Sequence, residues 1–329
     1  MAENMKAVVF NQYGGVDQLL IKDLPVPVVQ EGEVLIRVKA FGINRAEIQM
    51  RKGLWGDVAC VSGIECVGEV AMDKTGRYAR GQKVAAIMGG MGRSRNGSYA
   101  EYTCVPAANV FSVKTSLDWG DFAAIPESYA TAWSCLHDNL KINEGDVIFI
   151  RGGTSALGLA AIKLASVMFS ARVLASTRNP DNVSLLKDAG CSKVLIESAE
   201  LSEQIRSKYT EGIDGVMDII GNSTLLDSLK MVKKAGYVCN AGFLGGSEPV
   251  VFNPLMDMPS SVNLNFFASF MLGTADYSID KIPMQDIVFN AEQGKYKVKP
   301  VKKFAFNDIA QAHDLMESNK ACGKVVVVL

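Results

Sequence analysis

Between residues 145 and 168, a short strand, a tight glycine turn and a helix are predicted to follow one another directly. Four apolar, strand-forming residues at 147–150 precede the turn, and residues 156–168 are almost wholly apolar and rich in helix formers. Both elements are therefore expected to be buried. A helix that begins at the end of a buried strand presents unpaired N–H groups and the positive end of its dipole, which together attract a pyrophosphate. The turn is a candidate phosphate site.

This turn departs from the dinucleotide pattern Gly-x-Gly-x-x-Gly at one position, because Gly153 and Gly158 hold the outer places and Ser155 holds the middle one. We expect the Ser155 hydroxyl either to donate a hydrogen bond to a phosphate or to cap the helix. The candidate cofactor-binding residues of the turn are Gly153, Thr154, Ser155, Ala156, Leu157 and Gly158.

The chain of 329 residues is long enough for two domains. Residues 1–125 contain short strands separated by glycine-rich turns, which predicts a small β-barrel or sandwich, and residues 271–329 resemble them and are predicted to rejoin them. In residues 126–270, strands alternate with helices, which predicts a doubly wound parallel sheet. The expected strands are 6–10, 19–22, 34–40, 68–71, 83–87 and 98–105, then 147–150, 172–176, 193–196, 215–220, 237–240 and 262–267, and finally 298–304 and 324–329.

The charges nearly cancel, with 34 basic and 35 acidic residues, so no net field attracts nucleic acid or an anionic membrane, and we expect a small-molecule partner. The seven cysteines are scattered without a Cys-x-x-Cys pair, which argues against a disulfide framework and a structural zinc. Neither an amino-terminal signal core nor a run of membrane-spanning length is present in the sequence. We therefore expect a cytoplasmic protein.

The end of the second strand of such a sheet distinguishes the two nicotinamide cofactors, because an acid there binds a ribose hydroxyl, whereas basic or hydroxyl groups bind a 2′-phosphate. Here the strand leads into Ser176, Thr177 and Arg178, and the first carboxylate is Asp181. This favours NADP over NAD. The alternative is that Arg178 is only a solvated residue in a turn that ends at Pro180.

Several segments in order form a more specific pattern than the turn alone: 5–9, 42–47, 97–102, 131–133, the glycine turn and 323–326. With them, nearly the whole chain resembles the medium-chain dehydrogenase/reductase superfamily, and more narrowly its zinc-free quinone oxidoreductase branch. The resemblance implies a GroES-like catalytic domain from residues 1–125 and 271–329. It also implies a Rossmann NADP-binding domain from residues 126–270.

Zinc-dependent members of this superfamily hold a catalytic metal with Cys, His and Cys. The corresponding positions here are Asn44, Ile64 and Glu127, which cannot make a three-ligand zinc site. No metal is therefore expected. Without a Lewis acid to ionise a hydroxyl, the easier chemistry is hydride delivery from NADPH to an already polarised acceptor, a quinone or an α,β-unsaturated carbonyl.

The resemblance also implies a set of site residues. Asn44 would lie at the floor of the cleft near the nicotinamide, Thr131 under the ring, and Gly242 and Phe243 along the same pocket. The branch often has tyrosines where this chain has Gln49 and Trp55. We expect Gln49 to donate a hydrogen bond to a carbonyl oxygen and Trp55 to stack on a flat acceptor, or else only to close the lobe.

Two carboxylates, Glu47 and Glu65, lie near these positions. They suggest acid–base work, but the interpretation we favour is a scaffold in which they pair with Arg45 or Arg51. The two histidines, isolated from one another in the sequence, are expected at the surface or at helix ends.

The sequence leaves two other functions open: an enoyl-thioester or alkenal reductase of the same superfamily, and a non-catalytic NADPH-binding sensor or structural protein. The last strand of the sheet, residues 262–267, alternates apolar and polar residues. An exposed edge strand can pair with its twin, and the resemblance implies the same edge, so we expect a homodimer.

Overall fold

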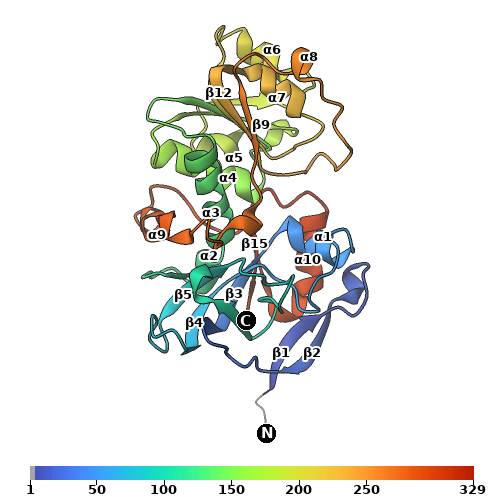
Figure 1. The fold of residues 1–329 in the computed structure, drawn as a ribbon, viewed down its shortest axis with the longest axis vertical. Coiled ribbons are helices and arrows are strands. Elements are labelled where there is room, and N and C mark those ends of the chain that lie inside the picture. Colours follow the sequence, from blue (N-terminus) through green and yellow to red (C-terminus); the bar gives the residue numbers. More distant parts are fainter. Residues whose placement is uncertain (1–3) are drawn as a thin grey trace. The chain divides into compact units, whose positions relative to one another are not determined.

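The computed structural model describes residues 4–329 (Figure 1). The chain divides into two compact units, unit 1 from Met1–Ala130 and Ser269–Leu329, and unit 2 from Thr131–Ala268. The carboxyl-terminal segment therefore returns to the amino-terminal unit.

Unit 1 is built from two sheets. The first is the antiparallel pair β1 (Asn4–Val9) and β2 (Leu20–Pro25). The second has seven strands in the order β14-β15-β3-β4-β5-β7, with β6 also paired to β3. Its strands are β3 (Glu33–Ile43), β4 (Glu65–Asp73), β5 (Lys83–Ile87), β6 (Tyr102–Pro106), β7 (Val110–Ser112), β14 (Lys302–Ala305) and β15 (Val325–Val328).

The core of unit 1 lies around β3, because this strand pairs with β4, β6 and β15 and is buried along most of its length. The helices α1 and α10 contact one another in this unit (Figure 1). The helices outside unit 2 are α1 (Arg45–Arg51), α2 (Trp119–Phe122), α9 (Met284–Glu292) and α10 (Ile309–Glu317), and α3 (Pro126–Ser134) spans the division between the units.

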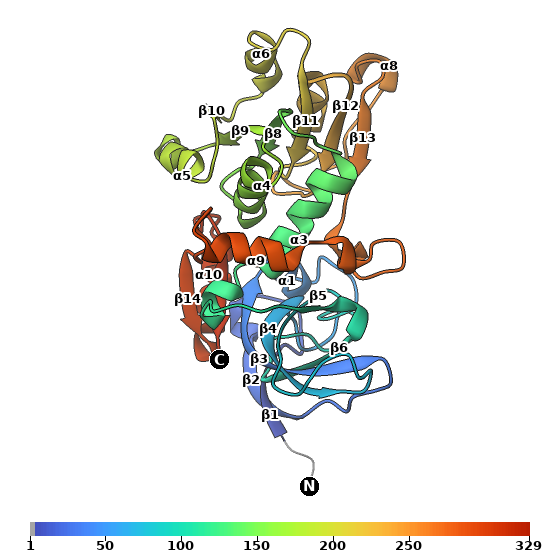
Figure 2. The ribbon, with the colours of Figure 1, turned by 90° about the vertical axis from the view of Figure 1, so that its left-hand side faces the viewer.

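Unit 2 contains one parallel sheet of six strands in the order β10-β9-β8-β11-β12-β13, and Figure 2 shows β10 and β13 at its opposite edges. The order places β8 and β11 side by side at the point where the chain reverses its direction of winding, so the doubly wound sheet is confirmed. Its strands are β8 (Val147–Arg151), β9 (Arg172–Thr177), β10 (Lys193–Ile196), β11 (Ile213–Asp218), β12 (Val232–Asn240) and β13 (Asn263–Phe266). Its helices are α4 (Ala156–Val167), α5 (Val183–Asp188), α6 (Leu201–Arg206), α7 (Leu225–Met231) and α8 (Pro254–Asp257).

Three details differ from the expected elements. The expected strand 98–105 is continuous only from Tyr102, because the N–H groups of Ser98 and Tyr99 bind carbonyls of the loop at Ser62 and Gly63 and Ala100 makes only an isolated bridge with Ala7. The expected strand 298–304 begins only at Lys302, after Pro300, whose missing N–H cannot join a ladder. The helices α1 and α2 are additional elements inside the part expected to be rich in strands.

All seven cysteines are free thiols. In the part of the chain that the structure describes, every helix is too short or too polar to cross a membrane.

Candidate functional site

The glycine turn of unit 2 depends on two glycines for its shape. Gly152 adopts φ +86°, a left-handed conformation that other residues rarely adopt. At Gly158, a Cβ atom would lie 2.5 Å from the carbonyl oxygen of Gly152, so only glycine lets the first turn of α4 pack against the end of β8. The turn is therefore specified by backbone conformation.

Ser155 is the N-cap of α4. Its hydroxyl accepts a hydrogen bond from the Gly158 N–H at 3.0 Å and donates one to the Gly152 carbonyl at 2.9 Å. The N–H groups of Ala156 and Leu157 in the first turn have no hydrogen-bond partner within residues 4–329. These two donors at the amino end of a twelve-residue helix fit a phosphate group, and the hydroxyl of Ser155 serves as the cap.

A buried ion cluster lies directly behind this turn. Arg151, the last residue of β8, is 1% exposed and binds Glu197 at 2.5 Å and Asp227 at 2.8 Å. It also donates to Ser228 Oγ at 3.1 Å. Asp218 accepts hydrogen bonds from the same hydroxyl and from backbone N–H groups, and burial raises the pKa of its carboxyl group above the ordinary value. The cluster connects β8 to α7 and to the segment after β10.

The end of β9 places three predicted residues in different surroundings. The Ser176 and Thr177 side chains are buried, and Ser176 Oγ accepts a hydrogen bond from the Gly152 N–H at 3.4 Å. Thr177 Oγ1 bonds the backbone of Asn179. The Arg178 side chain is exposed and makes no ion pair within the described residues. Within residues 4–329, Arg178 is therefore an unpaired cation at the end of β9, the strand that lies beside β8 and its glycine turn in the sheet.

The remaining predicted residues of unit 2 lie on two segments. Gly242 follows β12 and donates its N–H to Asn240 Oδ1, and a Cβ there would lie 2.7 Å from the Ile219 carbonyl oxygen. Phe243 is 50% exposed, and its ring centroid lies 5.5 Å from that of Phe266. Thr131 is buried in α3. Gly242 and Phe243 thus lie just after the end of β12, the strand next to β11 in the sheet.

Unit 1 holds the second group of predicted residues around a buried ammonium group. The register of β15 against β3 pairs Val325 with Ile43, so Lys324 lies beside Asn44. Lys324 Nζ donates to Glu65 Oε1 at 2.5 Å, to Asn44 Oδ1 at 2.5 Å and to Ser128 Oγ at 3.2 Å. This ammonium is 5% exposed. This cation thus binds residues that lie 196 to 280 positions away from it in the sequence.

The Asn44 amide is occupied on both sides. Its oxygen accepts from Lys324, and its nitrogen donates to Glu65 Oε1 at 3.0 Å and to Glu47 Oε1 at 3.3 Å. The backbone N–H groups of Asn44 and Ile64 also donate to Glu47. Asn44 is therefore a connecting group in this cluster, and any effect it has on a ligand depends on its partners.

Burial and neighbouring charges set the pKa values of this cluster. Burial raises the pKa of the Glu47 carboxyl group to about 7, with Lys324 opposing the rise and Glu65 adding to it. Burial lowers the pKa of the Lys324 ammonium, but attraction to Glu65 and Glu127 and the hydrogen bond to Glu65 outweigh it, so its pKa lies above the usual value. Lys324 therefore remains charged, and Glu47 titrates near neutral pH.

The geometry does not fit a zinc ion. Of the three positions that correspond to metal ligands, Asn44 binds the Lys324 ammonium, Glu127 lies 4.0 Å from it, and Ile64 has no ligand atom. Among the residues described, no group of three or more His, Cys, Asp or Glu side chains is arranged to hold a metal. An ammonium group already stands among the donors, and a second cation there would be repelled.

The expected pairing of Glu47 and Glu65 with Arg45 or Arg51 is wrong. Arg51 binds Glu317, and Arg45 donates to Asn319, both in the segment around the end of α10. Lys324 takes their place because β15 brings it directly to β3.

Of the two histidines, His137 is exposed in the segment that follows α3, as expected, whereas His313 differs from expectation. His313 is buried in α10, bonded to the Tyr99 hydroxyl at 3.0 Å, and burial lowers its pKa to about 3. It is a neutral core residue.

Gln49 and Trp55 lie on α1 and in the loop after it. Gln49 is half-buried, and its side-chain amide makes no hydrogen bond within the part of the chain described. Trp55 is 38% exposed, and the Arg93 guanidinium lies 5.9 Å from its ring centroid. A cavity of about 510 Å³ in the same unit is lined by Arg93 and Ile64 among others. Gln49 therefore keeps a free amide, whereas Trp55 already has a cationic neighbour.

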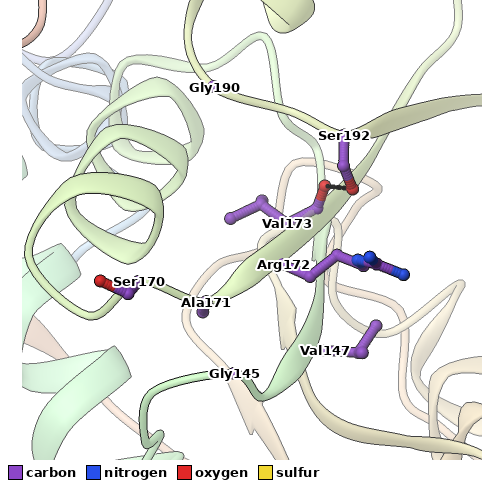
Figure 3. A pocket seen from close by; sticks show the side chains of 8 residues that line it. All are labelled: Gly145, Val147, Ser170, Ala171, Arg172, Val173, Gly190 and Ser192. Carbon is purple, nitrogen blue, oxygen red and sulfur yellow. Dashed lines mark hydrogen bonds between the residues drawn. The ribbon is translucent and has the colours of Figure 1, made fainter.

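A second cavity, of about 430 Å³, lies in unit 2 at the amino ends of β8 and β9 (Figure 3). Gly145 and Arg172 line it, and the Ser192 hydroxyl, bonded to the Val173 carbonyl, lies at its side. The glycine turn is at the carboxyl end of β8, so this cavity is on the opposite edge of the sheet from the phosphate site.

Comparisons with known proteins agree with this architecture. The family described as alcohol dehydrogenase GroES-like domain matches residues 30–115, and that described as zinc-binding dehydrogenase matches residues 156–281. A quinone oxidoreductase of Lama guanicoe is 25% identical over 338 residues, covering 99% of this chain and 98% of the relative. A 2-methylene-furan-3-one reductase of Solanum lycopersicum is 27% identical, covering 98% and 79%. The solved structure of mycobacterial Rv1454c complexed with NADPH has a TM-score of 0.86 at 24% identity, covering 99% and 100%.

The chain belongs to the medium-chain dehydrogenase/reductase superfamily, in its quinone oxidoreductase-like branch. It is an oxidoreductase of that superfamily, with a GroES-like unit and a Rossmann-type nucleotide-binding unit.

Three functional candidates escaped the sequence reasoning: Lys324, Arg151 and Arg93. Lys324 stands in the closing segment 323–326 already used as a landmark, and Gly42 faces it across the sheet, where a Cβ would collide with Glu65 and Lys324. The available signal was a glycine that pairs with the residue two positions after the lysine, since Gly42 is opposite Val326.

Proposed function

We propose that this protein is an NADPH-dependent, zinc-independent oxidoreductase that transfers a hydride to a quinone or an α,β-unsaturated carbonyl. The observation that carries the proposal is the Lys324 ammonium, bound to Asn44 and Glu65 where zinc-dependent members hold a metal. A site without a Lewis acid favours acceptors that are already polarised.

The proposal assigns the cofactor to unit 2. The free N–H groups of Ala156 and Leu157 would bind the pyrophosphate, with Gly153, Thr154 and Gly158 shaping the approach. Arg178 would bind the 2′-phosphate as an exposed cation beyond the buried Ser176 and Thr177 hydroxyls. NADPH is supported over NADH because no carboxylate follows β9 before Asp181.

In this scheme NADPH supplies a hydride, and a proton completes the two-electron reduction of the acceptor. Gln49 would donate its free amide N–H to the acceptor's carbonyl oxygen as negative charge develops there. Thr131, Gly242 and Phe243 would position the nicotinamide from unit 2. Asn44 would act as a positioning residue, held by Lys324 and Glu65.

Titration of the protein with NADPH and NADH, followed by steady-state oxidation against a panel of quinones and enones, tests the proposal. We expect Arg178→Gln to weaken NADPH binding about tenfold and to leave NADH unchanged, because a charge-assisted contact to the phosphate is lost. Arg172→Gln, an exposed residue at the other end of β9, is the matched control. Equal affinity for both cofactors in the wild type would contradict the NADP assignment.

Zinc independence has its own test. Activity should survive prolonged treatment with a chelator, and metal analysis of the active protein should find no stoichiometric zinc. Activity that is lost on chelation and restored by zinc alone would overturn this part of the proposal.

The same panel separates the two alternatives. The similarity to a 2-methylene-furan-3-one reductase supports enones, and turnover of alkenals or enoyl thioesters in preference to quinones would favour the reductase alternative. Tight NADPH binding without turnover on any acceptor would favour a non-catalytic sensor or structural role.

We also propose a homodimer formed through the edge strand expected at residues 262–267. The strand β13 lies at one edge of the sheet, and Phe266 is 56% exposed there. Size-exclusion chromatography with light scattering should give twice the chain mass, and Phe266→Lys should shift it towards the monomer. A wild-type protein that is monomeric at high concentration would contradict this.

A further inference from the structure

The cavity of about 510 Å³ in unit 1 has apolar walls and one uncompensated cation. Its walls include Ile64, Met88, Met91 and Phe270, and Arg93 and Asp57 are the charged residues that line it. Such a cavity has the size of a small-molecule site. The kind of ligand that this cavity could bind depends on the partners of these two charged side chains.

Aromatic rings, rather than carboxylates, hold the Arg93 guanidinium in place. Its central carbon lies 5.1 Å from the Phe270 ring centroid and 5.9 Å from that of Trp55. No carboxylate lies within ion-pair distance of it among residues 4–329, Asp57 included. By contrast Arg95, two residues later in the same loop, pairs with Glu33 at 2.6 Å. Arg93 therefore keeps its full charge available beside apolar walls.

We propose, on the basis of the function proposed above, that the preferred acceptors carry an anionic group on a flat apolar body, and that Arg93 binds this anion. The planar guanidinium presents paired N–H donors that match a carboxylate, sulfonate or phosphate. The apolar walls take the ring of the acceptor. Arg93 is thus a specificity-determining residue, and it takes no part in hydride transfer.

Asp57 gives the proposal a second test, because its side chain carries the charge opposite to that of Arg93. Its exposed carboxylate lines the same cavity and repels an incoming anion. Removing the Arg93 charge should weaken selection for anionic acceptors, and removing the Asp57 charge should strengthen it. If the two residues only shaped the wall of the cavity, their substitutions would not change the selection for anionic acceptors in opposite directions.

The experiment compares naphthoquinone with naphthoquinone sulfonate as acceptors for NADPH oxidation. For Arg93→Gln we expect kcat/KM with the sulfonate to fall about tenfold, mainly through KM, and with the neutral quinone to change less than about twofold. Asp57→Asn should raise kcat/KM for the sulfonate about two- to threefold. Arg80→Gln, an exposed arginine of the same unit outside this cavity, is the control for loss of one positive charge.

A binding measurement keeps this test separate from the proposed function. Naphthalene sulfonate, which accepts no hydride, should bind the wild type more tightly than Arg93→Gln in calorimetry, with unchanged melting temperatures. Equal binding by the two proteins, or equal losses with both quinones in Arg93→Gln, would overturn the anion proposal. Absence of NADPH oxidation with either quinone would instead contradict the function on which it rests.

Discussion

Each unit of the molecule contains a cluster of several carboxylates around a buried basic side chain, and the two clusters are built differently. Arg151 in unit 2 donates to Glu197 and Asp227, whose side chains are 16% and 13% exposed. Lys324 in unit 1 is surrounded by Glu65, which is 1% exposed, and by Glu47, which is fully buried. The carboxylates that pair directly with the cation are thus partly exposed in the first cluster, whereas Glu65 in the second is buried.

The difference determines which cluster responds to pH. Asp218, the fully buried acid of the unit 2 cluster, accepts hydrogen bonds from Thr224, Ser228 and two backbone N–H groups, which favour its charged form. Glu47 has fewer such donors, and its pKa rises to about 7. Burial raises the pKa of both carboxyl groups, and that of Glu47 reaches about 7, so we expect the unit 1 cluster to gain and lose a proton near neutral pH.

The largest expected effect is from Arg151→Met, which leaves two carboxylates without their cation behind the turn. Removal of one partner of a buried ion pair costs about 4–5 kcal/mol. Chemical unfolding should show this loss, and Arg172→Met, an exposed arginine of the adjacent strand, should change stability by less than about 0.5 kcal/mol. Equal losses in the two variants would remove the distinction between a buried and a solvated arginine.

Lys324→Met should cost somewhat less, about 3–4 kcal/mol at pH 8, because Glu47 can take up a proton when the ammonium is lost. The loss should shrink at pH 6. The double variant Lys324→Met/Glu65→Gln should recover part of it, since the stranded charge is then removed as well. A loss that is independent of pH would show that the two clusters behave alike.

Glu47→Gln tests the titration directly. Because the pKa of Glu47 is raised to about 7 from 4.5, its contribution to stability is present below pH 4.5 and lost as the pH rises through 7. This amounts to about 3 kcal/mol over that range. The variant should lack this component when unfolding free energy is measured against pH.

Glu33→Gln is the opposite control for that measurement. Arg95 and the Gln30 N–H lower the pKa of Glu33 against the effect of burial, so its stabilising contribution is present above pH 4.5 and lost as the pH falls. The same sign of change in both variants would contradict the assignment for Glu47.

The smallest effect is expected from Ser155→Ala. Loss of the N-cap should cost about 1 kcal/mol of stability, and Ser155→Asn should restore most of it. NADPH affinity should change little, because the hydroxyl already bonds Gly158 and Gly152. A large loss of affinity would show that the hydroxyl leaves its capping role to bind phosphate.

The fold was largely predictable from the sequence because its signals are local. The parallel sheet follows from apolar strands that alternate with helices, and the turn follows from Gly153, Gly158 and a good N-cap residue. The expected strand boundaries were wrong where the local sequence pattern favours a strand but the backbone N–H groups bind elsewhere. Residues 98–101 have strand-like composition, but the N–H groups of Ser98 and Tyr99 bind the loop at Ser62 and Gly63.

The candidate site was predictable only in part. The turn residues and the end of β9 come from contiguous stretches, so the candidate phosphate site and the positions that correspond to metal ligands could be proposed from the sequence. Proximity in the sequence makes Arg45 and Arg51 the expected partners of Glu47 and Glu65. In the structure these arginines bind Asn319 and Glu317 instead. Sequence proximity favours such choices, since it ignores strand pairing.

The sequence by itself therefore determined the strand, turn and helix that present free N–H groups, because backbone conformation depends on neighbouring residues. Only the tertiary structure decided what stands in place of the metal. Lys324 is 259 positions from Glu65 and 280 from Asn44, and the pairing of β15 with β3 brings them together. Burial then decides their charge states, because the cost of ionising a carboxyl group depends on the water and cations that the fold leaves around it.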